Sequence, residues 1–282
     1  MINWHFRTLM LALLMLAGGS MAVSAQVTKY VRYTADGRTS YGMLEGETIL
    51  ELSGDLFQSS RSTGKSVRLA DVTLLAPVVP SKVIAVGLNY KSHIGESPAA
   101  KYPGLFAKMP TSIVGPGANI VIPPGANNVH FEGELVVVIG RRAKNVSVAD
   151  APQYVFGVTV GNDVSERDWQ RADLQWFRAK AADTFGPLGP VIVKGANYGD
   201  LLLQTRVNGE VLQSQRTKDL IFDVPTIISY ISQFMTLEPG DVIYTGTPGT
   251  TKAMKAGDVV EIEIEGIGIL RNRVVASPPA SR

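Results

Sequence analysis

Two acidic residues that precede an apolar run constrain this chain more than any other feature. Glu132 and Glu134 lead into residues 135–140, whose Leu, Val and Ile side chains predict a buried strand. Because side chains alternate along a strand, both carboxylates are expected on the same side. Two unpaired anions are costly to bury, so we expect a cation between them, and hard divalent cations take oxygen ligands. The spacing leaves open that both carboxylates are solvated on an exposed edge strand.

A third carboxylate follows a second apolar run further along the chain. Residues 154–160 predict another buried strand, and Asp163 lies just beyond the end of that strand. A divalent cation held by side-chain oxygens needs several such ligands close together. We therefore take Glu132, Glu134 and Asp163 as the candidate metal ligands.

The first residues of the chain have the composition of a targeting segment. Arg7 gives a basic start, residues 9–17 form a short apolar core, and the small-residue pattern ends at Ala25. This pattern predicts a secretory signal peptide over residues 1–25, cleaved before Gln26, and hence a periplasmic or secreted protein. The apolar core is short for a membrane span. An uncleaved anchor or a misassigned start codon are the alternatives.

Composition excludes several classes of site. The chain has 282 residues, 27 basic and 25 acidic side chains, and no cysteine. The numbers of basic and acidic side chains are nearly equal, and the sequence contains no basic stripe. Both observations argue against nucleic-acid binding. The lack of cysteine excludes disulfides, thiolate zinc sites and a cysteine nucleophile. The 28 glycines and 16 prolines favour a turn-rich β architecture.

Residues 26–80 are expected to form a small β-rich N-terminal domain. Alternating runs are separated by turns, and Asp36-Gly37 between the first two runs is a strong hairpin signal. Residues 58–65 are polar and are expected to form a loop. Residues 75–80 carry two prolines and are expected to form an extended linker, because each proline keeps its predecessor out of the helical region.

Residues 81–275 are expected to form the main domain, followed by a loose tail over residues 276–282. Asn208-Gly209 predicts a second tight hairpin. Strand-like runs recur at residues 82–87, 120–122, 134–139, 154–160, 191–193, 202–207, 241–244, 259–264 and 270–275. The fold class is therefore expected to be α+β and mostly β.

Two helices are predicted within the main domain. Ser165 is expected to cap the first, with Asp168 completing a capping box, and this helix is expected to run to about Phe177. Pro225 is expected to start the second, which runs to Phe234 and presents an apolar face.

Several polar residues near the expected metal ligands are candidates for binding a substrate. Arg167 and Gln170 are three residues apart on the first helix, and an arginine there can bind a carboxylate bidentately. Lys180 lies among small and apolar residues and can hold an anion, and Thr247 follows a strand in a turn whose amides can bind a carboxylate. The alternatives are a solvated helix surface, a lysine that reaches solvent, and an ordinary turn.

His93 and Glu96 are a candidate general-base pair. They are three residues apart, and a carboxylate that binds an imidazole fixes its tautomer and raises its basicity. The nearby Gly95 and Pro98 make the segment a candidate lid. A surface histidine in a loop is the alternative.

Together these runs resemble the fumarylacetoacetate hydrolase family, in particular its acylpyruvase and 2-hydroxyhepta-2,4-diene-1,7-dioate isomerase-like branch. The resemblance extends from about Lys82 to Val274, and it is specific for the family but not for a substrate. The matching runs are residues 86–90 with His93, 115–117, 132–135, 162–165, 167–168, 183–190, 207–209, 239–243 and 245–248.

The resemblance implies a roll of mixed β-sheets around the site, usually in a homodimer. It implies that the three acidic residues bind Mg²⁺ or Mn²⁺, that His93 and Glu96 activate water, and that Lys180 contacts the substrate. Arg167, Gln170 and Thr247 match substrate-side positions. His130 departs from the family, where Asp is common at this position, and the signal peptide departs from mostly cytoplasmic relatives.

The function implied by this resemblance is hydrolysis of a C–C bond in a 2,4-dioxo acid of the acylpyruvate type. The partner is then a small 2-oxo or dicarboxylic acid, without nucleic acid and without a membrane after signal cleavage. Isomerisation of a 2-hydroxy-dienedioate and decarboxylation of oxaloacetate are alternatives for the same site. A periplasmic dicarboxylate-binding protein without turnover is the alternative from another class.

Overall fold

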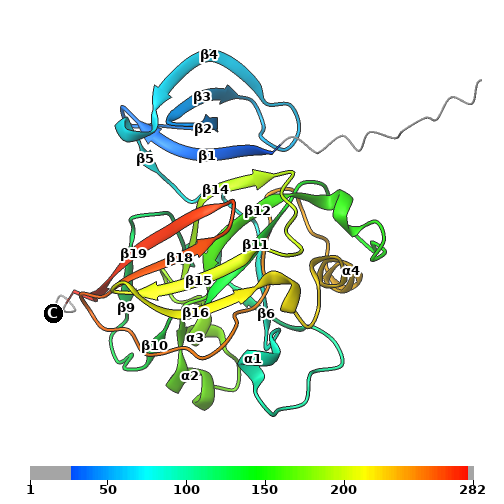
Figure 1. Ribbon diagram of the computed structural model, residues 1–282, viewed down its shortest axis with the longest axis vertical. Helices are drawn as coiled ribbons and strands as arrows, with labels where there is room; N and C mark the ends of the chain where they lie inside the picture. Colours follow the sequence, from blue (N-terminus) through cyan, green and yellow to red (C-terminus); the bar gives the residue numbers. More distant parts are fainter. Residues whose placement is uncertain (1–26, 279–282) are drawn as a thin grey trace, which may run out of the picture.

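The computed structural model describes residues 27–278. The signal peptide expected over residues 1–25 therefore lies outside the described residues. Within this range the fold is α+β and mostly β, with mixed sheets and a small N-terminal β unit, as the sequence predicts (Figure 1). Among the described residues, no helix is long and apolar enough to cross a membrane.

One long mixed sheet runs through both the N-terminal unit and the main domain. Its strands follow the order β4-β3-β2-β1-β14-β12-β11-β17-β6-β7, and β1 pairs with β14 with Thr28 opposite Lys194. Backbone hydrogen bonds therefore join the N-terminal unit to the main domain. The strands are β1 (Thr28–Ala35), β2 (Arg38–Glu45), β3 (Thr48–Ser53), β4 (Arg61–Arg68), β6 (Val83–Gly87), β7 (Gly104–Lys108), β11 (Gly133–Ile139), β12 (Val155–Asn162), β14 (Gly186–Lys194) and β17 (Val242–Tyr244), with β5 (Thr73–Leu74) and β8 (Ile113–Val114) beside this path.

A second sheet packs against the centre of the first. Figure 1 shows its strands crossing β11 and β12, and the order is β16-β15-β18-β19-β9. Buried aliphatic residues of both sheets, such as Val137, Val160, Leu203 and Ile262, share one core cluster. These strands are β9 (Asn119–Ile122), β15 (Leu202–Val207), β16 (Glu210–Arg216), β18 (Val259–Ile264) and β19 (Gly268–Ala276), and a small separate sheet consists of β10 (Val129–His130) and β13 (Ser165–Glu166).

The helices are short and lie outside the sheets. They are α1 (Lys91–Ile94), α2 (Arg167–Ala172), α3 (Phe177–Ala181) and α4 (Val224–Phe234). The expected helix from Pro225 to Phe234 is confirmed as α4, where Asp223 Oδ1 accepts a hydrogen bond from Thr226 N at 2.9 Å. Short 3₁₀ turns occur at Leu69–Asp71, Pro110–Ser112, Ala151–Tyr154 and Thr217–Asp219.

The expected capping box at Ser165 is wrong. Ser165 belongs to β13, and its hydroxyl donates to the Asp163 carbonyl at 2.8 Å. Glu166 caps α2 instead, and its carboxylate accepts hydrogen bonds from the amides of Trp169 and Asn128. Glu166 is fully buried, so its charge requires these donors. The helix ends at Ala172 rather than near Phe177.

The predicted hairpin turn is confirmed, whereas one polar segment forms a strand instead of the expected loop. Asp36 and Gly37 join β1 to β2 with φ of 50° and 72°, the left-handed values that a two-residue hairpin requires. Residues 58–65, expected as a loop, contribute to the exposed strand β4, which pairs with β3. A strand exposed on both faces lacks the apolar alternation that identifies strands in a sequence.

Candidate metal centre

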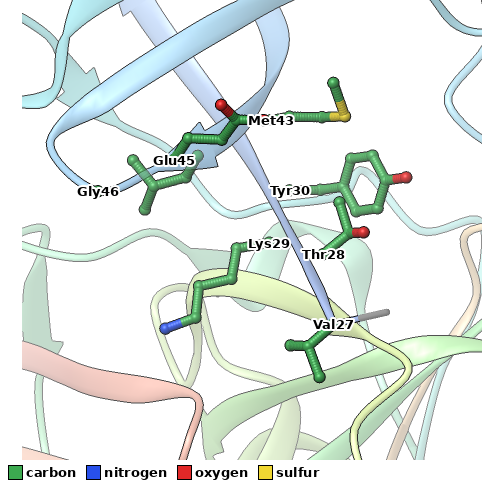
Figure 2. Close-up of a pocket in the computed structure, with 8 residues that line it drawn as sticks. Val27, Thr28, Lys29, Tyr30, Met43, Glu45 and Gly46 are labelled. Carbon is green, nitrogen blue, oxygen red and sulfur yellow. The ribbon is translucent and has the colours of Figure 1, made fainter. Parts of the chain in front are cut away.

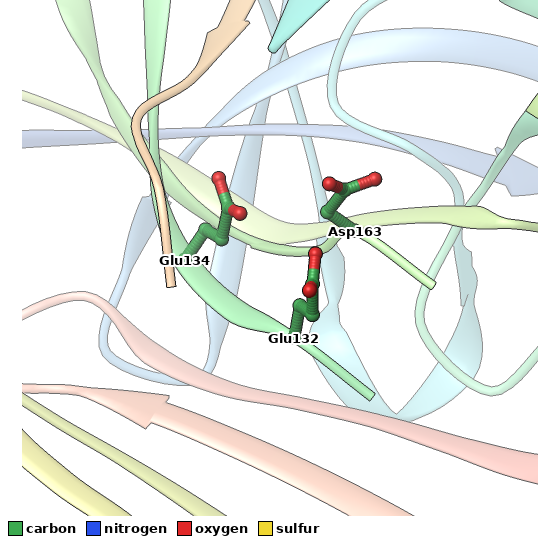
Figure 3. Close-up of side chains that lie close together, drawn as sticks. All are labelled: Glu132, Glu134 and Asp163. Carbon is green, nitrogen blue, oxygen red and sulfur yellow. The ribbon is translucent and has the colours of Figure 1, made fainter. Parts of the chain in front are cut away.

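Strand pairing brings the three acidic residues together. Glu132 lies just before β11 and Asp163 just after β12, and these strands pair so that Gly133 faces Asn162. One carboxylate oxygen from each of Glu132, Glu134 and Asp163 lies within 4.8 Å of the others (Figure 3). The three residues are 1–3% exposed, because β11 is central in the sheet. The alternative of solvated carboxylates on an edge strand is therefore wrong.

Basic side chains surround two of the three carboxylates. Lys180 Nζ lies 2.6 Å from both Glu132 Oε2 and Asp163 Oδ2, and Arg167 pairs with the other oxygen of Glu132. Glu134 differs, because it accepts a hydrogen bond from Gly246 N at 2.7 Å and pairs with no cation in the described range. The cluster therefore has one buried carboxylate whose charge is not compensated.

This asymmetry separates the pKa values of the two glutamates. Burial raises the pKa of Glu132, but Lys180 and Arg167 outweigh burial and hold that pKa well below its ordinary range. Burial, together with the charges of Asp163 and Glu132, raises the pKa of Glu134 well above its ordinary value, and the Gly246 amide offsets this only in part. A divalent cation at the cluster would stabilise the ionised form of Glu134.

Lys108 is a member of this cluster that sequence analysis missed. Its Nζ donates to Asp163 Oδ1 at 2.6 Å and to the Lys180 carbonyl, and its side chain is fully buried. Burial lowers the pKa of Lys108, and the charge of Asp163 opposes that change. Because most lysines reach solvent, nothing in its local sequence marks Lys108 as part of a site.

The predicted substrate-side residues lie at the same centre. There, Arg167 and Thr247 also form hydrogen bonds with other protein groups. Arg167 donates to Gln170 Oε1 at 2.8 Å and to Thr251 Oγ1 at 3.0 Å. Thr247 donates to the Gly133 carbonyl at 3.0 Å. Their contact with a substrate stays a prediction.

His130, the departure from the family pattern, lies beside this arginine network. Its ring nitrogens lie 2.8 Å from Thr251 Oγ1 and from Asn128 Oδ1. Burial and the nearby Arg167 lower the pKa of His130 to about 4, so the imidazole is neutral at neutral pH. The position therefore adds no second cation next to Arg167.

A cavity of about 170 Å³ connects these residues to solvent. His93 lines this cavity, and its Nδ1 lies 2.6 Å from the Gly249 carbonyl. The predicted site residues that line it are His93, Glu132, Glu134, Asp163, Arg167, Gln170, Lys180 and Thr247.

Glu96 is the predicted site residue that the structure does not bring to the cavity. Helix α1 ends at Ile94, and Gly95 turns the backbone with a φ of 60°, so the helical spacing between His93 and Glu96 is not formed. Glu96 is exposed, and no hydrogen bond joins it to His93 in this structure. The joint action of His93 and Glu96 as a general-base pair stays a prediction.

A larger cavity of about 720 Å³ lies at the N-terminal unit. Figure 2 shows side chains of β1 and β2 around it, including Tyr30 and Met43. Its charged lining residues are Lys29 and Glu45, and it contains none of the buried carboxylates. Its size alone does not make it the chemical centre of the protein.

Comparison with known proteins assigns the chain to a family. Residues 82–275 match the model described as fumarylacetoacetate (FAA) hydrolase C-terminal. The chain belongs to the fumarylacetoacetate hydrolase family. Residues 28–77 match a second model, Rv2993c-like, N-terminal.

The relatives of this family member include enzymes with isomerase and tautomerase names. The chain is 49% identical to Protein Rv2993c of Mycobacterium tuberculosis, over 81% of this chain and 88% of the relative. It is 45% identical to the human mitochondrial oxaloacetate tautomerase FAHD2A, over 73% of this chain and 70% of that relative. The crystal structure of 2-hydroxyhepta-2,4-diene-1,7-dioate isomerase from Mycobacterium marinum has a TM-score of 0.84 at 46% identity, covering 89% of this chain and 99% of that one.

The carboxylate cluster fits the divalent metal that enzymes of this family bind. All three donors are buried oxygen ligands, which is the donor type that hard divalent cations prefer. Glu134 also supplies a specific reason for a cation, because its charge is buried beside two other carboxylates without a basic partner in the described chain.

Proposed function

We propose that this fumarylacetoacetate hydrolase family enzyme moves a proton at the carbon next to the 2-oxo group of a 2-oxo acid. The product is the enol tautomer or a double-bond isomer. Glu132, Glu134 and Asp163 would hold Mg²⁺ or Mn²⁺, which supplies positive charge beside the 2-oxo oxygen when bound. The isomerase and tautomerase names of several relatives support this reaction class.

The hydrogen bond between His93 and Gly249 carries the proposal. A backbone carbonyl only accepts hydrogen bonds, so the Nδ1 that lies 2.6 Å from it must carry the proton. In the tautomer with its proton on Nδ1, Nε2 has a lone pair, and His93 lines the cavity of the metal centre. His93 is therefore equipped to take a proton from a substrate carbon and to return it elsewhere.

The basic residues of the cavity complete the chemistry. Burial lowers the pKa of Lys180, but Asp163 and Glu132 outweigh burial and raise it, so Lys180 stays cationic and does not serve as the base. With Arg167 it places fixed positive charge where the carboxylate of the substrate and the developing negative charge would lie. A fixed charge in a buried site needs little reorganisation during the reaction.

Hydrolysis of acylpyruvates is the second candidate function. It needs a group that activates water, and Glu96 lies three residues after His93 on an exposed segment that could bring it closer. The maleylpyruvate hydrolase from Sphingobium sp. SYK-6 is 28% identical to this chain, with a TM-score of 0.75. Decarboxylation of oxaloacetate uses the same positive charge but no water-activating base.

Turnover by the purified protein with Mg²⁺ or Mn²⁺ tests the proposal. We expect interconversion of the keto and enol forms of oxaloacetate, or isomerisation of a 2-hydroxy-dienedioate, with loss of activity in chelator. Glu96→Gln should keep this activity within about threefold, since His93 alone transfers the proton, whereas acylpyruvate hydrolysis should fall about a hundredfold or more.

The exposed Glu210→Gln is the matched control, because Glu210 lies on β16 and does not line the cavity. Rapid acylpyruvate hydrolysis without enolisation would favour the second candidate. Binding of 2-oxo acids without turnover of any of them would favour the binding-protein alternative and overturn the proposal.

A further inference from the structure

Another cavity, of about 260 Å³, lies directly beside the cavity of the metal centre and is called the second cavity below. The two share three lining residues, Gly87, Leu88 and Trp176. The second cavity is otherwise lined by Gly104, Leu105, Phe106, Leu174 and Gln175. None of these side chains is ionisable, so a carboxylate would find no counter-charge there, in contrast to the basic side chains of the metal-centre cavity.

An aromatic pair lies where the two cavities meet, because Trp176 lines both of them and Phe106 lines the second. The rings of Phe106 and Trp176 meet edge to face, with centroids 5.5 Å apart, and Lys180 Nζ lies 4.8 Å from the centre of the Phe106 ring. Gly87 permits this arrangement, because a Cβ at that position would lie 3.2 Å from the Trp176 ring. The Phe106 ring therefore contacts a cation of the metal centre, while both rings line the apolar cavity.

The rim of the second cavity exposes apolar side chains to water. Leu174 is 97% exposed and Leu88 is 53% exposed. Leu88 also has a φ of 58°, a left-handed conformation that is unfavourable for a bulky residue and that is enriched at active sites and ligand clamps. Covering these side chains with an apolar group would be favourable, because it removes their surface from water.

We propose that the cavity between Leu88, Leu174 and Trp176 is a subsite for the apolar end of the substrate, an alkyl or aryl group on a 2-oxo acid. The inference rests on the proposed function, because the 2-oxo acid end must lie at the metal centre. Shared lining residues let one molecule occupy both cavities. A small dianion such as oxaloacetate would occupy only the cavity that contains the basic residues.

The experiment compares a substrate that has an apolar end with one that has none. The enolisation of phenylpyruvate and of oxaloacetate is measured as kcat/KM with Mg²⁺ for the wild type, Leu174→Asn and Val148→Asn. Leu174 lines only the second cavity, and its exposure makes a polar residue compatible with the fold. Val148 is the control, a 49% exposed apolar residue in a turn that does not line either cavity.

Leu174→Asn should lower the phenylpyruvate-to-oxaloacetate ratio of kcat/KM about tenfold, the usual scale for a lost apolar contact in a pocket. Val148→Asn should leave the ratio unchanged. An equal fall for both substrates, or an unchanged ratio in Leu174→Asn, would overturn the subsite. Asn is neutral, so it adds no electrostatic bias against the dianion.

Calorimetric binding separates this inference from the proposed function. If the wild type turns over neither acid, the proposed function fails, but the subsite still predicts tighter binding of phenylpyruvate than of pyruvate to the Mg²⁺-loaded protein. Leu174→Asn should remove that preference. Equal affinity of the wild type for the two acids would show that the second cavity does not bind the apolar end.

Discussion

Lys108 Nζ lies 2.6 Å from Asp163 Oδ1, and both side chains are removed from solvent. The pair joins the end of β7 to the end of β12, and 55 residues separate its members in the chain. Lys108 thus holds one oxygen of Asp163, while Lys180 holds the other at 2.6 Å. The orientation of this candidate metal ligand depends on two buried lysines, only one of which sequence analysis identified.

Lys108→Met should destabilise the metal-free protein. The substitution leaves Asp163 with Lys180 as its one remaining cationic partner, and breaking a buried ion pair typically costs about 3 to 5 kcal/mol. We expect a fall of this size in the free energy of unfolding, measured by urea denaturation in chelator. Lys252→Met is the control, because Lys252 is 64% exposed and should change stability by less than about 0.5 kcal/mol. A fall no larger than that of the control would show that Lys180 alone compensates Asp163.

Stability of the metal-free protein should depend on the ionisation of Glu134. The pKa of Glu134 in the folded state lies well above its ordinary value of 4.5, so the folded state binds this proton more tightly than the unfolded state does. Its contribution to stability is therefore fully present below about pH 4.5 and is lost as pH rises toward the folded pKa. Urea denaturation in chelator between about pH 5 and 8 measures this loss.

Glu134→Gln should remove that part of the pH dependence, because the amide does not ionise. The variant should also be at least as stable as wild type near pH 8, since the repulsion from Asp163 and Glu132 is absent. An identical pH profile in the two proteins would contradict the assignment of the raised pKa to Glu134.

Metal binding should release protons, and more of them at low pH. A carboxylate must be ionised to act as a ligand, so Mg²⁺ or Mn²⁺ must displace the proton of Glu134. We expect calorimetry in buffers of different ionisation enthalpy to show this release, and we expect Glu134→Gln to weaken metal binding about tenfold or more. Full activity in the presence of chelator would contradict the metal-site assignment.

His93→Ala should keep its metal and lose proton transfer. His93 lines the cavity but bonds to Gly249 rather than to any of the three carboxylates. Turnover at matched metal occupancy should fall about a hundredfold, the usual scale for a lost general base. Oxaloacetate decarboxylation should fall much less. Ser97→Ala on the same exposed segment is the control, and wild-type turnover by His93→Ala would assign the base to another residue.

Export is predicted from the first residues of the chain. Arg7, the apolar residues 9–17 and the cleavage pattern ending at Ala25 predict a mature protein that begins at or near Gln26. N-terminal sequencing of the protein purified from a periplasmic or secreted fraction of its native host measures this directly. A chain that retains Met1 in the cytosolic fraction would show that residues 1–25 are not a signal peptide.

The sequence by itself determined most of the local turns and strands, and it marked the three acidic residues as candidate ligands. Turns such as Asp36-Gly37 depend on the backbone preferences of adjacent residues, and strands depend on alternation over a few positions. Glu132 and Glu134 fall in one such pattern, and Asp163 ends another, so these three were identified without knowledge of contacts. The same local signals misplaced the helix cap, because Glu166 takes its hydrogen bonds partly from the distant Asn128.

Only the tertiary structure decided how the charges of the site are compensated. Electrostatic interaction depends on distance in space and on burial, neither of which a sequence pattern contains. Lys108 reaches Asp163 across 55 residues, and Gly249 holds His93 across 156 residues. Glu134 remains without a basic partner because the nearby cations pair with its neighbours. The packing of β7, β11 and β12 therefore sets the charge balance that makes this cluster a candidate metal centre.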